Sequence, residues 1–507
     1  MLLLGLDIGT TGCKASLFED DGRLLASAWR EYSIDMPHPS WAEQDAEQVW
    51  RLAQEAMSEV YHKLGGHQAI LALSLSVQGE AVMPVDRRGN ALRPAILGMD
   101  TRTGGQNRWL EERFGNRDLF QRTGMPIHTI NTLPKLLWLK DHDPETWEAA
   151  HRFLLYEDFL INKLAGRAVI SRCLASRTQM FDLHQGCWSE EILEAIGLAP
   201  ERLAQVYPSG VAVGAMAPVL VEQLGFPNAP LIVTGGHDQA CGSLGVGLTR
   251  PGLSMVSTGT AEVVEVALDS PVLTQALAEG NISVYNHVVP GLFLAMTLNH
   301  SGGLILRWFR DTFCPLEVAA AHSSGADPYD LIYRDLTPGP SPVLLLPHFS
   351  GSGTPHFDTL SKGALVGLTF GTTKADIAKA ILEGLTFELR YNLETLNQGQ
   401  VLVEELRAIG GGARSKLWLQ LKADITGLRV LAPRITEAAS WGAAALAGAG
   451  AGIFKNAAQA VEEALRFEQV YEPRPEQQAV YQKRYELYRQ LYPALAELHH
   501  RMEMNTP

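Results

Sequence analysis

A carboxylate, Asp238, follows an apolar run and a Gly-Gly pair in the stretch Ala-Pro-Leu-Ile-Val-Thr-Gly-Gly-His-Asp-Gln over residues 229–239. An apolar strand does not easily carry an Asp, so we expect a turn at Gly235-Gly236 that brings this side chain to the floor of a cleft. Small residues around it would let a ligand come close. The same pattern is typical of a helix N-cap, and this stretch alone does not decide between a catalytic base and a cap.

The start of the chain has residue types that bind phosphate. Residues 2–18 predict a strand, a Gly-Thr-Thr-Gly turn and a second strand. The turn offers backbone N–H groups and the hydroxyls of Thr10 and Thr11, with Asp7 before it and Lys14 after it. Phosphate needs such donors, and a magnesium–phosphate complex takes a nearby carboxylate, usually through water. The alternative is a plain hairpin whose Thr hydroxyls cap their own backbone.

A second Gly-Thr turn lies in the middle of the chain. Residues 253–266 again show an apolar run, a turn at Gly259-Thr260 and a second strand. This weak internal repeat predicts two related domains, each opening with a hairpin whose turn faces a shared cleft. We expect the boundary near residue 245, just after Asp238.

Polar side chains follow two further predicted strands. Gln78 and Glu80 come after the apolar run 70–77, and Asp100 and Arg102 come after the run 94–98. Ligand groups of α/β folds lie at such strand ends, and a carboxylate and an amide there suit a polyhydroxylated substrate. Exposed loops are the alternative for all four residues.

A triple glycine, residues 410–412, lies between a predicted strand and a helix start. Backbone this bare can approach a flat ring or a phosphate closely, although a tight strand–helix connection explains it equally well. Residues 448–452 also alternate glycine and alanine, but they follow an Ala-rich helical run, so we interpret them as a closely packed helix end.

Several classes of protein are disfavoured. The chain has no Gly-Lys dipeptide, hence no Walker A loop, and its first turn is not the GxGxxG of a dinucleotide fold. A net charge of −14 disfavours nucleic acid or an anionic membrane as the main partner. Five cysteines without a CxxC pair fit reduced thiols, and no basic leader precedes Asp7, so we expect a cytoplasmic protein. His348 and His356 lack a third ligand at useful spacing for zinc.

Helical patterns surround these motifs. Pro134 fits the first turn of a helix over 133–139, and Gly166 fits the end of another over 158–164. Tyr481, Tyr485, Tyr488 and Tyr492 form a stripe that predicts packing of a C-terminal helix, followed by a solvated tail with His499 and His500.

In this order the motifs resemble those of the FGGY family of carbohydrate kinases over nearly the whole chain. The first hairpin is similar to its phosphate motif and the triple glycine to its adenosine motif. Residues 133–141 and 362–383 are similar to its two signatures. The resemblance implies an α/β fold of the actin-like ATPase type, with duplicated ribonuclease-H-like domains around a central cleft. We assign residues 1–245 to a sugar-binding domain with the base, 246–495 to an ATP-binding domain, and 496–507 to a tail.

The resemblance also implies ATP and Mg²⁺ as cofactors, and roles for individual residues. Asp238 matches the general base, and Asp7 the carboxylate near magnesium. The remaining roles are contacts to the phosphates for Thr10, Thr11, Lys14, Gly259 and Thr260, a nucleotide contact for Gly303, the adenosine turn for Gly411 and Gly412, and contacts to substrate hydroxyls for Gln78, Glu80 and Asp100.

Two positions depart from the family pattern. Gly98 stands where sugar kinases often carry a Trp that packs on the substrate, and Gly79-Glu80 replaces the Met-His of xylulose-type members. The Gly-His-Asp-Gln stretch is more similar to deoxy-ketose kinases. These features make a strict xylulokinase or glycerol kinase doubtful and select no single sugar.

The sequence therefore predicts transfer of a phosphoryl group from MgATP to a primary hydroxyl of a ketose or polyol. Xylulokinase or glycerol or gluconate kinase activity in the strict sense is one alternative, and a non-catalytic sugar or nucleotide sensor is another. A dehydrogenase is disfavoured by the absent dinucleotide motif. The oligomeric state, monomer or homodimer, stays open.

Overall fold

A six-stranded mixed sheet forms the centre of the first domain. In this computed structural model, which describes residues 1–336, 338–435 and 437–504, an antiparallel β1–β2–β3 meander lies beside parallel strands β5 and β14. Strand β1 buries its leucines on both faces, as expected for a strand covered by helices on both sides. In sheet order the strands are β13 (Ala212–Ala215), β14 (Leu231–His237), β5 (Ile70–Val77), β1 (Leu2–Ile8), β2 (Gly12–Phe18) and β3 (Leu24–Glu31).

The second domain repeats this plan. Its antiparallel hairpin β15–β16 continues into β18, while β15 pairs in parallel with β21 and β21 with β22, as β1 does with β5 and β5 with β14. The duplication predicted from two Gly-Thr turns is thereby confirmed. In sheet order the strands are β17 (Ser283–Asn286), β18 (Phe293–Asn299), β16 (Glu262–Leu268), β15 (Leu253–Thr258), β21 (Glu405–Ile409), β22 (Arg429–Pro433) and β23 (Phe467–Tyr471).

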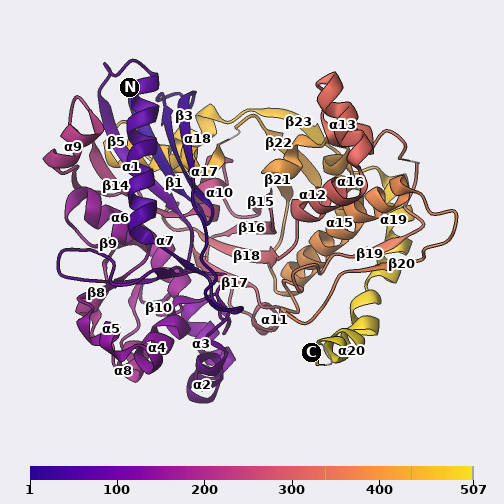
Figure 1. The fold of residues 1–507 in the computed structure, drawn as a ribbon, viewed down its shortest axis with the longest axis horizontal. Helices are drawn as coiled ribbons and strands as arrows, with labels where there is room; N and C mark the ends of the chain where they lie inside the picture. The colour runs from indigo at the N-terminus through magenta and orange to yellow at the C-terminus, as the bar shows by residue number, and fades with distance from the viewer. Residues whose placement is uncertain (337, 436, 505–507) are drawn as a thin grey trace.

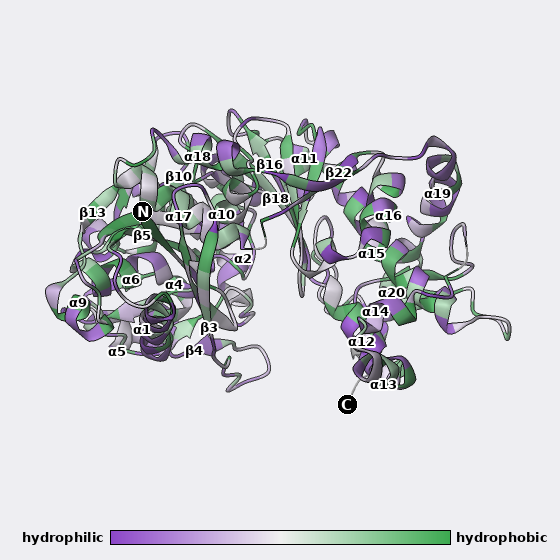
Figure 2. Cartoon of the chain, turned by 90° about the horizontal axis from the view of Figure 1, so that it is seen from above, coloured by the Kyte–Doolittle hydropathy of each residue, from purple (hydrophilic) through white to green (hydrophobic). Residues whose placement is uncertain are grey.

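Helices cover both sheets, and the two domains stand side by side (Figure 1). Figure 2 shows hydrophobic strands such as β5 inside the first domain. No helix among the described ranges is long and apolar enough to cross a membrane. The helices used below are α1 (Ala46–Lys63), α2 (Gly104–Phe114), α4 (Thr132–His142), α6 (Tyr156–Ala165), α7 (Arg172–Ala175), α10 (Asp238–Gly245), α12 (Gly303–Phe313), α15 (Lys374–Gln398), α16 (Lys416–Thr426), α17 (Ala438–Gly450), α19 (Pro475–Tyr488) and α20 (Leu491–Met504).

Helices α10 and α17 cross between the two sheets through small residues. A Cβ atom added to Gly245 would lie 2.0 Å from the carbonyl oxygen of Ala438, and one added to Gly442 would lie 1.9 Å from that of Cys241. Each glycine therefore lets one backbone pack directly on the other. Helix α17 also covers the first sheet, where a Cβ at Gly5 would lie 2.0 Å from the oxygen of Ser440. A segment of the predicted second domain thus packs on the first, and the boundary at 245 stays a prediction.

The prediction of a turn at Gly235-Gly236 is wrong. Both glycines lie inside β14, which runs to His237 with a register shift against β5 between Val233 and Gly236. A Cβ at Gly235 would lie 1.6 Å from the oxygen of Leu75, so the glycines serve close strand packing rather than a change of direction. The strand end itself delivers Asp238.

The prediction of a solvated C-terminal tail fits Glu497 and Leu498, which are exposed, but is wrong for His499 and His500. Helix α20 packs back, burying His499, whose Nδ1 accepts from the backbone N–H of Lys362, while His500 Nε2 lies 2.8 Å from Asp358 Oδ2. Residues 505–507 of the predicted tail lie outside the described ranges. The tyrosine stripe packs as predicted: Tyr481 and Tyr488 are buried against α15, where their hydroxyls donate to buried glutamates.

Candidate active site

Asp238 is the first residue of α10 and is not its N-cap, which is His237. Its Oδ1 accepts from the backbone N–H of Gln239 at 2.6 Å, its side chain is 27% exposed, and it forms no ion pair with a Lys or Arg of the described ranges. Burial, and then the nearby charge of Asp7, raise the pKa of Asp238 to about 8. A carboxylate that holds a proton this strongly, yet reaches solvent, is suited to accept a proton.

Asp7, near the end of β1, lies at the same edge of the sheet. Strand β5 separates β1 from β14, so Asp7, Gln78 and Asp238 lie at the ends of three neighbouring parallel strands. Asp7 Oδ1 accepts from the Ser76 hydroxyl at 2.6 Å, and burial raises its pKa against the opposing effects of Ser76 and Lys14. Two carboxylates thus flank the end of β5.

The first turn is held from outside through two of its carbonyl oxygens. The Tyr32 hydroxyl donates to the oxygen of Gly9 at 2.7 Å, and Gln44 Nε2 donates to that of Thr10 at 2.9 Å. Thr10 is half-buried and Thr11 exposed. Lys14, predicted near the phosphates, lies 2.7 Å from Glu437 Oε2 at the start of α17. This ion pair joins the first hairpin to the second half of the chain.

The second turn is open on one side and supported on the other. Gly259 and Thr260 are exposed, and a Cβ at Gly259 would meet nothing within 4 Å. Behind them, the N–H of Gly303 donates to the oxygen of Gly259 at 2.8 Å, and that of Gly302 to the oxygen of Thr260 at 2.8 Å. The start of α12 therefore fixes this turn while leaving its outer face free for a ligand.

The triple glycine packs on the same turn. Gly410 has φ 80°, a left-handed conformation that favours glycine, and a Cβ there would lie 2.6 Å from the oxygen of Thr258. Beneath it, Lys422 Nζ donates to the Thr258 hydroxyl at 2.8 Å and contacts Glu262 Oε2 at 2.5 Å, with both charged side chains 1% exposed. This buried cluster joins the Gly259-Thr260 turn to the triple glycine. The spacing of its residues in the sequence did not indicate it.

Glu80 and Gln78 line the site from the loop after β5, and both are buried rather than in an exposed loop. Glu80 has φ 59°, an uncommon conformation for a non-glycine residue, and its Oε1 accepts from Arg177 Nε at 2.6 Å. Gln78 Nε2 donates to Gln44 Oε1 at 3.0 Å. Arg177 is the main residue that the sequence did not reveal, because its position gave no motif and its partner is 97 residues away.

Asp100 and Arg102 form a buried ion pair with each other. Asp100 is fully buried, and its oxygens accept from the Arg102 guanidinium and from the backbone N–H of Ala42. Arg102 also lies 2.8 Å from Glu43 and 3.7 Å from the Trp41 ring. Each side chain is thus already paired within the protein, and substrate contact for both stays a prediction.

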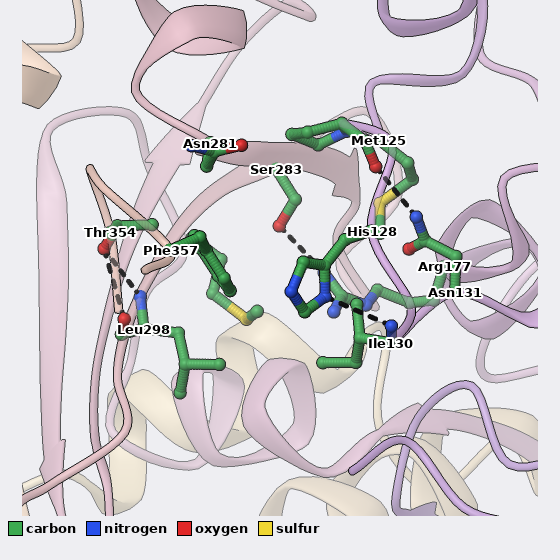
Figure 3. Close-up of a pocket in the computed structure, with 12 residues that line it drawn as sticks. Met125, His128, Ile130, Asn131, Arg177, Asn281, Ser283, Leu298, Thr354 and Phe357 are labelled. Atoms are coloured by element: carbon green, nitrogen blue, oxygen red, sulfur yellow. Dashed lines mark hydrogen bonds between the residues drawn. The ribbon is translucent and has the colours of Figure 1, made fainter. Parts of the chain in front are cut away.

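A cavity between the domains lies beside Glu80 rather than beside the two aspartates. Figure 3 shows lining residues from the first domain, including His128 and Arg177, and from the second, including Ser283 and Phe357. Arg177 spans both sides, because its Nη1 donates to the Ser283 hydroxyl at 2.9 Å while its Nε holds Glu80. Gly98 leaves space here: a Cβ would lie 3.4 Å from Glu80 Oε2 and 3.6 Å from Ile130.

Comparison with known proteins identifies this arrangement. The chain matches the models of the N-terminal and C-terminal domains of the FGGY family of carbohydrate kinases over residues 2–245 and 254–451. The chain belongs to this family. The curated xylulose kinase of Escherichia coli K12 is 30% identical over 98% of this chain and 100% of its own length, and the gluconokinase of Bacillus subtilis is 29% identical over 88% of this chain and 86% of its own.

A solved structure described as a xyloylose kinase from Brucella ovis superposes on this chain with a TM-score of 0.87 at 27% identity. The superposition covers 98% of this chain and 100% of the Brucella one. The fold is accordingly the actin-like ATPase architecture of the FGGY kinases. The protein is a sugar kinase, a phosphotransferase acting on a sugar, and kinases of this family use ATP, usually with Mg²⁺.

Proposed function

We propose that this kinase transfers the γ-phosphoryl group of MgATP to a primary hydroxyl of an open-chain ketose or polyol, with Asp238 as the general base. The observation that carries the proposal is the environment of Asp238. This carboxylate is the first residue of α10 and has no cationic partner in the described ranges, and burial raises its pKa to about 8. The relatives named xylulose kinase and gluconokinase support an open-chain acceptor.

Asp238 would accept the hydroxyl proton as the acceptor oxygen forms a bond to the γ-phosphorus and the bond to the leaving ADP oxygen breaks. The backbone N–H of Gln239 holds Oδ1, so Oδ2, which accepts no hydrogen bond from the described residues, is the oxygen for the acceptor. Proton abstraction by a positioned base typically contributes about 10²- to 10⁴-fold to the rate.

The two Gly-Thr turns would hold the phosphates from opposite sides with the hydroxyls and backbone N–H groups of Thr10, Thr11 and Thr260, since the N–H groups of Gly9 and Gly259 already donate within their turns. Magnesium would supply positive charge to the transferred group. Asp7 fits an ion bound through water, since one of its oxygens takes only the Ser76 hydroxyl and no group of three or more His, Cys, Asp or Glu side chains in the described ranges forms a complete metal cage.

The remaining predicted contacts divide between the domains. Gly411, which is exposed, would pack on adenosine, with Gly412 packed behind it on Thr258, and Gly303 would contact the nucleotide beside the second turn. Gln78 and Glu80 would bind acceptor hydroxyls at the end of β5. Lys14 would exchange Glu437 for a phosphate oxygen when ATP is bound, since both side chains are partly exposed.

The test is ADP release with excess acceptor over a panel of pentuloses, deoxy-ketoses, polyols and aldonates. We expect one open-chain ketose or polyol to give the highest kcat/KM. Preferred turnover of an aldonate would replace the acceptor class with an alternative. Asp238→Asn should slow ADP release with the best acceptor by about 10²- to 10⁴-fold, whereas Asp311→Asn, on the exposed side of α12, should not change it.

A further inference from the structure

Strained backbone gathers around the cavity between the domains. Asn281 and Phe357, which line it, have φ of 52° and 49°, and Glu80 beside it has φ of 59°, in a left-handed region that favours glycine. Gln179, with φ of 66°, donates from Nε2 to two backbone oxygens of the cavity wall. Among the non-glycine residues of the described ranges, only Gln400 also has a positive φ. Such strain is typical of functional sites, so it points to the cavity as a ligand site.

Phe357 forms an aromatic wall that reaches from the second domain to the first (Figure 3). Its ring packs edge-on against the ring of His128, with the centroids 4.5 Å apart. The backbone just before it is fixed, because Asn281 Nδ2 donates to the oxygen of Pro355 at 2.8 Å. The two strained residues of the lining thus act together to hold one flat apolar surface at the cavity.

Most polar side chains of the lining bond to the protein itself. Arg177, the cation of the described lining, donates from Nε to Glu80 Oε1 and from Nη1 to the Ser283 hydroxyl. The Thr354 hydroxyl donates to a side chain of α15, and Asn131 Nδ2 donates to a backbone oxygen, while the unpartnered Asn131 Oδ1 is shielded from solvent. The surface left for a ligand is mainly apolar. It comes from Met125, Pro126, Ile130, Met296, Leu298 and Phe357.

His128 offers one hydrogen-bond donor to the cavity. Burial lowers the pKa of His128 to about 4, so its ring is neutral near pH 7 and has a single N–H. Its Nδ1 accepts from the backbone N–H of Ile130 at 3.1 Å, so the hydrogen is on Nε2, which has no partner among the described residues. This N–H can donate to one oxygen of a ligand, such as the carbonyl oxygen of a ketose, but it cannot accept from a hydroxyl.

Gly98 connects the cavity with the proposed acceptor contact Glu80. A Cβ at Gly98 would lie 3.4 Å from Glu80 Oε2 and 3.6 Å from Ile130, which lines the cavity. Gly98 is only half-buried, so solvent reaches this place. A larger side chain would lie between the carboxylate and the cavity wall. The glycine therefore leaves a passage from one to the other.

The loop after β5 also adjoins the proposed base. A Cβ at Gly79 would lie 3.0 Å from the ring of His237, the residue that precedes Asp238. Arg177 holds Oε1 of Glu80, while Oε2 has no partner in the described part of the chain. An acceptor with its primary hydroxyl at Asp238 and a second hydroxyl at Glu80 Oε2 would extend its far end past Gly98 into the cavity.

We propose that the cavity is the subsite for the end of the acceptor opposite the phosphorylated hydroxyl, and that it selects a methyl or short alkyl end, as in a 1-deoxy-ketose, over a hydroxymethyl or carboxylate end. This inference rests on the proposed function and narrows its acceptor class. A methyl group gains from the apolar wall, whereas a hydroxymethyl group would exchange water for it. A carboxylate would meet no free cation, because Arg177 is held by Glu80.

Two matched pairs of pentuloses test the subsite by steady-state ADP release. They are D-xylulose with 1-deoxy-D-xylulose, and D-ribulose with 1-deoxy-D-ribulose. The members of a pair differ only at C1, which is a hydroxymethyl group in one and a methyl group in the other, and both have the primary hydroxyl at C5. In the pair that is turned over faster, we expect kcat/KM of the deoxy member to be about 10- to 100-fold higher, as for discrimination in an apolar pocket.

Two variants assign this preference to the cavity. Gly98→Leu should bring the two members within about 3-fold of each other, because its side chain blocks the passage to the cavity. Met296→Gln, on β18, keeps the size of the side chain but adds an amide to the wall, so it should raise kcat/KM of the hydroxylated member relative to the deoxy member. The matched control is Met99→Gln, which lies beside Gly98 but is 53% exposed and outside the described lining, and which should leave the ratio unchanged.

Equal or higher kcat/KM for the hydroxylated member in the wild type would overturn the subsite while leaving the proposed kinase reaction in place. A deoxy preference that both Gly98→Leu and Met296→Gln keep would also overturn it, because the selectivity would then lie elsewhere. Turnover of neither pair would overturn the ketose acceptor itself, and the subsite with it. The role of Asp238 is tested separately, since a ratio between two acceptors does not depend on which residue is the base.

Discussion

The two domains share one topology but differ in what their equivalent positions carry. In the first hairpin, Asp7 lies two residues before Gly9, whereas the equivalent position before Gly259 is Ser257. After the third parallel strand, the first domain places His237 and Asp238 at the start of α10, and the second places Glu437 and Ala438 at the start of α17. The second domain keeps the turns and backbone N–H groups and lacks the two carboxylates.

The glutamate that the second domain does have is paired. Glu437 lies 2.7 Å from Lys14, while Asp238 has no cationic partner in the described part of the chain. Duplication of a fold therefore duplicated a phosphate-binding turn but not a base. This asymmetry shows that both copies of the fold can bind phosphate, while only the first domain needs to carry the reacting groups. The asymmetry also predicts which substitutions have a larger effect in one domain than in the other.

The largest effect is expected from Asp238→Asn, which removes the proposed base while keeping shape and size. We expect kcat to fall by about 10²- to 10⁴-fold, with ATP affinity retained. Glu437→Gln, at the N-cap of the corresponding helix in the second domain, should change kcat less than about 3-fold, because its partner Lys14 is partly exposed and its ion pair is weak. Steady-state ADP release measures both, and equal losses would contradict the asymmetry.

Lys422→Met breaks the buried cluster of the second domain without touching the first. The free energy of unfolding should fall by about 3–5 kcal/mol, because Glu262 is left as an uncompensated buried charge. The second turn rests on Thr258, so KM for ATP should also rise. Denaturant unfolding measures the first effect, and Lys374→Met, whose exposed pair with Glu317 is weak, is the control. A stable variant with normal ATP binding argues against the support given to this turn.

Asp7→Asn tests the other carboxylate that the second domain lacks. We expect magnesium to bind about 10- to 100-fold more weakly in the presence of nucleotide, as for loss of an outer-shell partner of a metal. The equivalent Ser257→Ala should leave magnesium dependence unchanged. Titration of activity with magnesium at saturating ATP distinguishes the two, and a magnesium requirement that follows Ser257 instead would reverse the assignment of the hairpins.

The smallest effect concerns pH and stability. Burial raises the pKa of Asp238 from 3.8 to about 8, so the folded protein holds this proton where the unfolded chain has released it. Its contribution to the free energy of unfolding therefore falls as pH rises between those two values. The melting temperature of Asp238→Asn relative to wild type should rise between about pH 5 and about pH 8. A difference that stays constant with pH would show that this carboxyl titrates normally in the fold.

The hairpins, the duplication and the location of Asp238 were predictable because they depend on local patterns. The residues 2–18 and 253–266 predicted their strands correctly, and Gly166 ends α6 in a left-handed conformation as expected. The turn at Gly235-Gly236 was wrong because close packing against Leu75 selects glycine as strongly as a turn does. Local sequence does not distinguish these two reasons.

The rest of the site depends on partners far apart in the chain. Glu80 was expected in the site, but its fixed orientation comes from Arg177, and a hydrogen bond between His237 and Tyr285 spans 48 residues and two domains. Asp100 matched a motif yet is occupied by Arg102, because a carboxylate at a strand end fits an ion pair as well as a substrate. Only the folded arrangement shows which partner each charge has.

The most direct test of the account is the chemical step itself, followed by rapid quench after mixing enzyme, MgATP and the best acceptor at saturating concentrations. We predict that Asp238→Asn binds both substrates but forms sugar phosphate in the first turnover at least about 10²-fold more slowly than wild type. Under the same conditions Glu437→Gln should form it at the wild-type rate. A first turnover of normal speed in Asp238→Asn would contradict the claim that the first domain alone supplies the base.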